Sequence, residues 1–130
     1  MGNDFQASTP GGPPRLRPMQ AGELMPLDVG IVVRGYHSDA TRTFSVDRNP
    51  TDEQLQGQQR IVDVFTAIEA AARPGVSCKA LWQQAYEMLN GYNGWSFSHH
   101  LGHGIGLSCH EAPRLNPHWD DILQVGDVIT

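Results

Sequence analysis

The chain has 130 residues, of which 39% are hydrophobic and 18% charged, so it has the size and composition of one globular domain or of part of one. Its net charge is -5 and its basic residues are scattered, which argues against binding to nucleic acid or to an anionic membrane. No apolar run reaches the ~18–20 residues of a membrane span, and Cys78 and Cys109 are too few for a disulfide framework. We therefore expect a cytoplasmic protein with reduced cysteines.

The first 23 residues are expected to form a loop-rich leading segment, because residues 8–23 hold four prolines and three glycines. Residues 24–35 and 36–46 then predict two strands, since both are rich in β-branched and aromatic side chains. The two strands meet near Arg34 and Gly35. This order predicts a β-hairpin directly after the leading segment.

Two helices are predicted next. Thr51 and Gln54 have the spacing of a capping box at the start of the first, and Pro74 ends it. Ser77 can cap the second, which ends at Asn90. Apolar residues at helical spacing predict one buried face on each helix: Ile61, Val64, Phe65 and Ile68 on the first, and Leu81, Ala85, Met88 and Leu89 on the second. The pattern then returns to short segments, and residues 123–130 predict a last strand.

Asp28 and Asp39 are the first candidate site residues. A hairpin that turns at Val33-Arg34 would place them directly opposite each other on one face, with Cβ atoms roughly 4.5–5.5 Å apart. Two such carboxylates repel each other, and one or two divalent cations between them would turn that repulsion into a binding site. The alternative is a turn elsewhere, with Asp39 exposed and Asp28 in a loop.

The stretch SHHLGHGIGLSCHE, residues 98–111, holds four of the six histidines. His103 lies among glycines, which would let a ligand or substrate approach the backbone closely, while His99 precedes it by four positions and His110 follows it by seven. A solvated polar loop is the alternative reading of these residues. Together with the aspartate pair, one imidazole would complete the ligand set of a hydrolytic metal such as Mn²⁺, Co²⁺ or Zn²⁺.

Taken together, the segments LDVGIVVRGYHSDATRTF and GHGIGLSCHEAP, separated by two helices, resemble the signature segments of the pita-bread metallopeptidases. That family includes methionine aminopeptidases, aminopeptidase P and Xaa-Pro dipeptidases. The resemblance runs from about residue 8 to residue 130, and FSHHLGHGIGL followed by HEAP is more similar to the Xaa-Pro branch. It implies an α+β fold, a partial pita-bread domain over residues 1–130 in which two helices cover an antiparallel sheet.

The resemblance also implies a site with two adjacent divalent metal ions (Mn²⁺, Co²⁺ or Zn²⁺) bridged by a water or hydroxide. Asp28 matches a bidentate ligand, Asp39 matches the ligand that bridges both metals, and His103 matches the single histidine ligand. His110 matches a histidine that hydrogen-bonds the scissile amide or its tetrahedral intermediate, and His99 matches one that lines the substrate pocket. These two are the expected catalytic residues. The neighbouring His100 is expected to be a bystander.

The sequence departs from the family pattern in two places. The family completes its metal site with two glutamates beyond the segment GDVIT, and this sequence ends at Thr130. An upstream histidine of the family is absent, because residues 9–14 read TPGGPP. With three of five protein ligands, the chain by itself is expected to be a weak or inactive part of a catalytic domain.

The function that the resemblance implies is hydrolysis of an amide bond next to proline in small Xaa-Pro peptides by a metal-dependent exopeptidase. The sequence leaves the oligomeric state open, and the resemblance makes a homodimer one possibility, since Xaa-Pro enzymes of this family are commonly dimers. Two alternatives stay open: a catalytically incomplete module that binds peptides or partner proteins, and a creatinase-like hydrolase that cleaves a different C–N bond. Retention of two acidic and two histidine site residues favours the enzyme.

Overall fold

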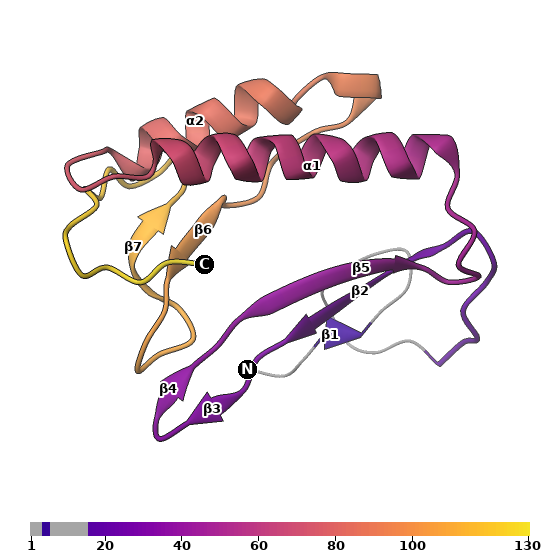
Figure 1. The fold of residues 1–130 in the computed structure, drawn as a ribbon, viewed down its shortest axis with the longest axis horizontal. Helices are drawn as coiled ribbons and strands as arrows, with labels where there is room; N and C mark the ends of the chain where they lie inside the picture. The colour runs from indigo at the N-terminus through magenta and orange to yellow at the C-terminus, as the bar shows by residue number, and fades with distance from the viewer. Residues whose placement is uncertain (1–3, 6–15) are drawn as a thin grey trace.

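The computed structural model describes residues 4–5 and 16–130 (Figure 1). The first half of the chain forms strands β1 (Asp4–Phe5), β2 (Leu24–Val29), β3 (Val32–Val33), β4 (Tyr36–His37) and β5 (Ala40–Ser45). The second half forms helices α1 (Asp52–Ala71) and α2 (Cys78–Leu89), the short 3-10 helix η1 (Tyr92–Gly94), and strands β6 (Gly102–Gly104) and β7 (Glu111–Leu115). Both predicted helices and the predicted hairpin are present.

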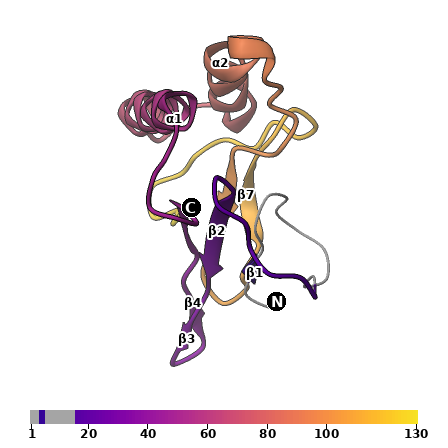
Figure 2. The same ribbon diagram turned by 90° about the vertical axis from the view of Figure 1, so that its right-hand side faces the viewer.

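The helices form one layer and the strands the other. α1 and α2 lie side by side, and the strands lie on one side of the pair (Figure 2). β2 is the central strand of an antiparallel sheet with β1 and β5, while β3–β4 and β6–β7 form two further antiparallel pairs. The expected α+β class with antiparallel strands covered by two helices is therefore confirmed, with small sheets in place of one. None of the described helices has the length and apolarity that a membrane crossing needs.

The hairpin formed by strands β2 to β5 turns one residue later than predicted. A turn at Val33-Arg34 would have placed the two aspartates opposite each other. Val33 pairs with Tyr36, so Arg34 and Gly35 form the turn, with φ of 53° and 88°. Positive φ at both central residues is typical of a type I′ turn, whose backbone twist matches that of the flanking strands. The predicted meeting point of the strands is confirmed.

This later turn moves the two aspartates out of direct opposition. Asp28 pairs with Thr41, so the prediction that it faces Asp39 is wrong. Asp39 precedes Thr41 by two residues, which is the spacing of side chains on one face of a strand. Residues related in this way across antiparallel strands are diagonal neighbours, roughly 7–8 Å apart. The hairpin can therefore still direct both carboxylates to one side.

Helix α1 begins at the predicted cap but buries less than predicted. The Thr51 hydroxyl accepts a hydrogen bond from the Gln54 backbone N–H, and the Gln54 side chain accepts one from the Thr51 N–H, which confirms the capping box. Val64 is buried, but Ile61 and Phe65 are 54% and 70% exposed, so the predicted buried face is wrong at these two positions. The reason is that Val64 is the α1 residue buried in the cluster with Ala85 and Leu89 of α2, while Ile61 and Phe65 lie outside this cluster.

Helix α2 supplies half of the buried hydrophobic residues of the described chain, and its predicted apolar face is confirmed. The Ser77 hydroxyl caps it by accepting from the Ala80 N–H. Two clusters of buried side chains meet it: Cys78, Leu81, Leu115 and Leu123 in one, and Val64, Ala85 and Leu89 in the other. Leu101, which directly precedes β6, packs against both clusters. Strand β6 is thereby fixed to the core, whereas no residue between 16 and 56 is buried.

The last predicted strand is only partly formed. The backbone of residues 128–130 hydrogen-bonds to β6 and the residue after it: the His103 N–H donates to the Thr130 carbonyl, and the Ile105 N–H donates to the Val128 carbonyl. Only a single bridge, between Gly104 and Ile129, has strand geometry. The segment therefore pairs with β6, as predicted, but only its last three residues do so.

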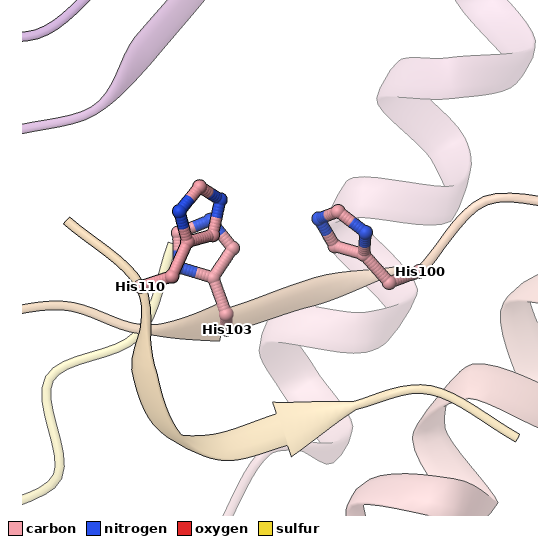
Figure 3. Close-up of side chains that lie close together, drawn as sticks. All are labelled: His100, His103 and His110. Atoms are coloured by element: carbon pink, nitrogen blue, oxygen red, sulfur yellow. The ribbon is translucent and has the colours of Figure 1, made fainter. Parts of the chain in front are cut away.

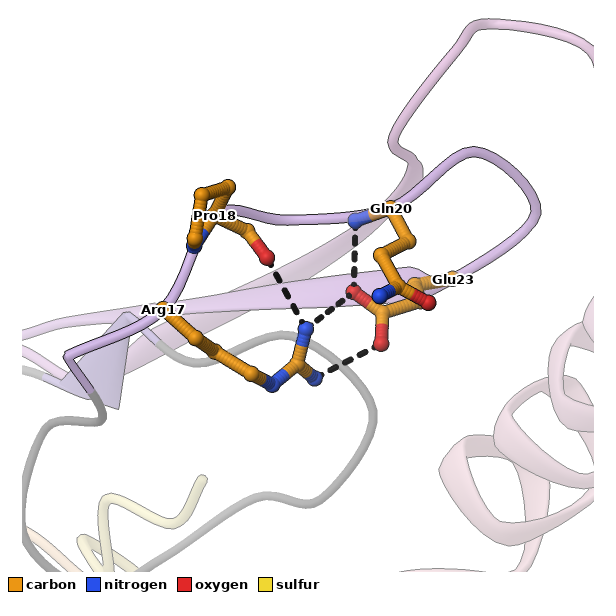
Figure 4. A network of polar contacts seen from close by, with 4 residues as sticks. All are labelled: Arg17, Pro18, Gln20 and Glu23. Atoms are coloured by element: carbon orange, nitrogen blue, oxygen red, sulfur yellow. Dashed lines mark hydrogen bonds and ion pairs between the residues drawn. The ribbon is translucent and has the colours of Figure 1, made fainter.

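The leading segment is described at residues 4–5 and 16–23: residues 4–5 form the short strand β1, which the prediction of a loop-rich segment did not include, whereas residues 16–23 are irregular, as predicted. An ion pair closes this second part (Figure 4). The Arg17 guanidinium contacts the Glu23 carboxylate at 2.6 Å and also donates to the Pro18 carbonyl. The Gln20 N–H donates to the same carboxylate. Glu23 is thus engaged within this loop. The proline- and glycine-rich residues 8–15 lie outside the described part of the chain.

Candidate metal centre

His103 is the best-fixed residue of the candidate site. It lies in the middle of β6 with 8% of its surface exposed. Its Nδ1 is 3.0 Å from the Gly104 carbonyl oxygen, which can only accept a hydrogen bond, so Nδ1 carries the proton of the neutral ring. The lone pair of the ring is therefore on Nε2. This nitrogen is 3.5 Å from Oδ2 of Asp39.

Backbone hydrogen bonds bring Asp39 to His103 from the other half of the chain. The His37 N–H donates to the Gly106 carbonyl at 2.8 Å, which ties the β3–β4 end of the hairpin to the loop after β6. Thr130 pairs with His103 through its backbone and donates from its hydroxyl to the Asp39 carbonyl at 3.4 Å. The Asp39–His103 pair is therefore positioned by main-chain contacts on both sides.

The glycines on either side of His103 allow neighbouring main-chain segments to pack closely against β6. A Cβ on Gly102 would collide with the carbonyl of Thr130, and a Cβ on Gly104 would collide with the carbonyl of Ala112. Neighbouring main chains thus occupy the space beside both glycines. The expectation that a ligand approaches the backbone here is wrong at these two positions, because the residues are needed for close packing of β6 between β7 and the segment that ends at Thr130.

The Asp39–His103 pair fits a divalent metal ion. Two ligand atoms bound at ~2.1 Å to one tetrahedral ion lie about 3.4 Å apart. The observed distance between Oδ2 of Asp39 and Nε2 of His103 is 3.5 Å, longer than a good hydrogen bond between a ring nitrogen and a carboxylate. One carboxylate oxygen and one imidazole lone pair directed at a common point are the donors that Mn²⁺, Co²⁺ and Zn²⁺ accept. Asp28 is half-buried on the neighbouring strand β2.

Three histidines gather beside this pair (Figure 3). One ring nitrogen from each of His100, His103 and His110 can be chosen so that all lie within 4.8 Å of one another. The rings of His103 and His110 have centroids 4.0 Å apart. His100, which is expected from the sequence to be a bystander, lies in this group with the other two rings. The candidate site therefore contains a residue that the sequence did not single out.

His99 lies at the edge of this group. Its ring lies against that of His100, tilted by 36° with centroids 3.8 Å apart, and its Nδ1 donates to the His100 carbonyl at 2.9 Å. The His99 carbonyl accepts from Nε1 of Trp82 on α2, which fixes the segment to the helix. His99 lines the pocket described below.

The environment of His100 keeps its ring neutral. Burial lowers the pKa of His100 to about 4, and the nearby rings of His99, His103 and His110 add to the shift. Protonation of His100 costs free energy because the charged ring would lose hydration on burial and would be repelled by neighbouring histidines when they are protonated. At neutral pH His100 therefore presents a lone pair.

A pocket of about 390 Å³ opens over the histidines. Its wall also contains Arg114, His118 and Trp119 from β7 and the loop after it. The Arg114 guanidinium lies over the Trp119 ring, 5.5 Å from its centroid, within the roughly 6 Å reach of a cation–π contact. These three residues were not predicted from the sequence. The available signal was an aromatic residue and a histidine directly after Pro117.

The remaining acidic residue near the site is engaged locally. The Glu111 carboxylate accepts from the Ser108 N–H at 3.0 Å, which closes the loop between β6 and β7. Glu111 therefore holds the loop that carries His110. Both cysteines of the chain are free, as expected, and Cys78 is buried in the core.

Comparison with known proteins matches residues 5–130 to metallopeptidase family M24. The chain is 35% identical to the Xaa-Pro dipeptidase of Pyrococcus furiosus over 113 residues, which cover 86% of this chain and 32% of that protein. It is 32% identical to the Xaa-Pro dipeptidase of Pyrococcus horikoshii over 127 residues, or 97% and 36% of the two chains. The chain thus spans about a third of the length of these relatives.

Solved structures show the same fold. The prolidase from Pyrococcus furiosus superposes with a TM-score of 0.88 at 31% identity, covering 99% of this chain and 40% of that one. The methionine aminopeptidase from Thermotoga maritima superposes with a TM-score of 0.66 at 20% identity, covering 85% and 45%. These likenesses confirm the expected pita-bread fold over the part of each neighbour that this chain covers.

Proposed function

We propose, from the premise that this chain belongs to metallopeptidase family M24, that it provides the metal-binding and substrate-facing residues of an exopeptidase acting on small Xaa-Pro peptides. The observation that carries the proposal is the 3.5 Å approach of the Asp39 carboxylate to Nε2 of His103 in a site that a pocket adjoins. The substrate class comes from the relatives, which are named Xaa-Pro dipeptidase and prolidase.

In this proposal Asp28, Asp39 and His103 hold two divalent metal ions. Bound metal lowers the pKa of water and polarises the scissile carbonyl, which supplies the hydrolytic chemistry. His103 would bind metal through Nε2, and the hydrogen bond from its Nδ1 to the Gly104 carbonyl fixes the orientation of the ring. The part of Asp39 is to offer the carboxylate that faces this nitrogen. Mn²⁺, Co²⁺ and Zn²⁺ all suit these donors.

His110 and His99 are proposed to face the substrate. His110 is exposed and its ring lies against that of His103, so an N–H of His110 can reach a substrate carbonyl held next to the metal ligands. A hydrogen-bond donor at this place stabilises the negative charge that develops on the carbonyl oxygen during attack. His99 lines the pocket farther along and is proposed to limit the shape of the substrate.

The activity proposed for the chain by itself is low. The family resemblance places two glutamate ligands after the segment GDVIT, so residues 1–130 contribute three of five protein ligands. Carboxylates also supply general-base capacity, and fewer of them means slower proton removal from the attacking water. A homodimer belongs to the same proposal by analogy with the Xaa-Pro branch, and a cytoplasmic location belongs to it because both cysteines are free.

The test is hydrolysis of an Ala-Pro dipeptide with added Mn²⁺, measured for the chain and for Asp39→Asn. Asp47→Asn is the matched control, because the Asp47 carboxylate accepts from Ser45 and Asn49 in a turn at the other end of the hairpin. Turnover that is lost with Asp39→Asn and kept with Asp47→Asn supports the proposal. Turnover that survives Asp39→Asn contradicts the role of this carboxylate.

If the folded chain shows no turnover at all, Mn²⁺ binding by calorimetry decides. Binding that Asp39→Asn removes and Asp47→Asn keeps supports a metal site whose activity needs further ligands. A folded chain that binds Ala-Pro but no Mn²⁺ favours the alternative of a peptide-binding module.

A further inference from the structure

We infer that His100, His103 and His110 form a second cation site, made of nitrogen donors only, which takes Zn²⁺ in preference to Mn²⁺ and shares His103 with the site that contains Asp39. The inference starts from the grouping of these three rings, in which one nitrogen of each lies within 4.8 Å of the others (Figure 3). It goes beyond the proposed function, which gives His100 no part and places His110 against the substrate.

Imidazole nitrogens suit Zn²⁺, Ni²⁺ and Cu²⁺, whereas Mn²⁺ is bound mainly by carboxylate and carbonyl oxygen. Three histidines with a fourth position open to water is also a known coordination of zinc. Here the pocket of about 390 Å³ adjoins the three rings, so a hydrated ion can reach them. The donor set and the access therefore both match zinc.

The geometry needs a small adjustment. Nitrogen ligands at ~2.0–2.1 Å from a tetrahedral zinc ion lie about 3.4 Å apart. In the structure the three ring nitrogens lie within 4.8 Å of one another, so some of them must move closer. His103 is buried and held by Gly104, so it stays in place. His110 is exposed, and rotation about its side-chain bonds costs little. His100 and His110 are therefore the residues that close around the ion.

Sharing of His103 makes the two sites compete. Nδ1 of His103 donates to the Gly104 carbonyl, so Nε2 holds the only free lone pair of the neutral ring. One lone pair binds one ion. Zinc on the three histidines therefore takes Nε2 away from a metal held with Asp39, and it also takes His110 away from a substrate.

The experiment is calorimetric titration of the metal-free chain with Zn²⁺ alone and, separately, with Mn²⁺ alone. The variants are His100→Ser, Asp39→Asn and, as the matched control, His118→Ser, which removes a histidine of the same pocket wall from outside the group of three. Circular dichroism verifies the fold of each variant. His100→Gln replaces His100→Ser if the serine variant does not fold.

We expect His100→Ser to weaken Zn²⁺ binding at least about tenfold, as loss of a zinc ligand does, with His118→Ser and Asp39→Asn within about twofold of the unchanged chain. Mn²⁺ binding should show the opposite pattern, with loss in Asp39→Asn and none in His100→Ser. Zn²⁺ affinity that is unchanged in His100→Ser, or lost in Asp39→Asn, overturns the second site, as does an unchanged chain that binds no Zn²⁺. The Mn²⁺ titration tests the proposed function separately.

Discussion

The close packing around Gly104 predicts that a single added methyl group disturbs both folding and the metal site. A Cβ on Gly104 would collide with the Ala112 carbonyl and lie 2.9 Å from the nitrogen of Pro113. All of these are main-chain atoms, so a side chain cannot rotate out of the way. Ordinary contact needs about 3.4 Å or more, and the Ala112 carbonyl is the closest of these atoms, so β6 and β7 must move apart by about 1 Å or more.

We expect Gly104→Ala to lower the free energy of unfolding by about 1–3 kcal/mol, the usual cost of overpacking. Since His103 directly precedes Gly104 and its Nδ1 donates to the Gly104 carbonyl, the same shift should weaken Mn²⁺ binding. Urea denaturation of the metal-free chain and calorimetric titration with Mn²⁺ measure the two effects.

Gly22→Ala is the control for this prediction. Gly22 has a φ of 84° and open space around it, so alanine there strains one turn of the leading segment without pressing on β6. Its Mn²⁺ affinity should equal that of the unchanged chain. The reasoning is refuted if Gly104→Ala matches the unchanged chain in both stability and Mn²⁺ affinity.

Three further predictions follow from burial and charge. Burial and nearby aspartates raise the pKa of Cys78 to about 11, so iodoacetamide at pH 8 should alkylate Cys109 and leave Cys78 intact, as peptide mass analysis would show. Because the pKa of His100 is lowered in the fold, the unfolded chain binds this proton at a higher pH than the folded chain does. The metal-free fold should therefore lose stability as pH falls from about 6.5 toward 4. An NMR titration of His100 with a midpoint near 6.5 would contradict this. Leu81→Ala should cost about 3 kcal/mol by denaturation because Leu81 is 1% exposed, whereas Phe65→Ala should cost far less, and equal losses would refute the assigned core.

The helices could be predicted from the sequence because their signals are local. Thr51 with Gln54, and Ser77 before α2, satisfy backbone N–H groups within one turn of themselves, so no distant part of the chain has to be known. The aligned signature segments likewise identified the fold. The register of the hairpin needed one more fact, the positive φ of Arg34, which a non-glycine residue adopts rarely and which sequence pattern does not reveal.

The histidine group could be predicted only in part for a different reason. Spacing alone does not say which of two adjacent histidines points toward His103, because residues 99 and 100 lie outside regular structure. The contact of Trp82 with the His99 carbonyl helps to set that orientation, and it joins segments 17 residues apart. In the same way, the exposure of Phe65 depends on where α2 crosses α1, and the periodicity of α1 carries no information on that.

The central claim is that Asp39 and His103 bind the same metal ion, and a crystal structure of the chain grown with Mn²⁺ tests it most directly. The proposal predicts an anomalous difference peak within bonding distance, about 2.0–2.3 Å, of both Oδ2 of Asp39 and Nε2 of His103. A Mn²⁺ ion that contacts neither atom, or one that lies on the histidines with Asp39 turned away, would contradict it.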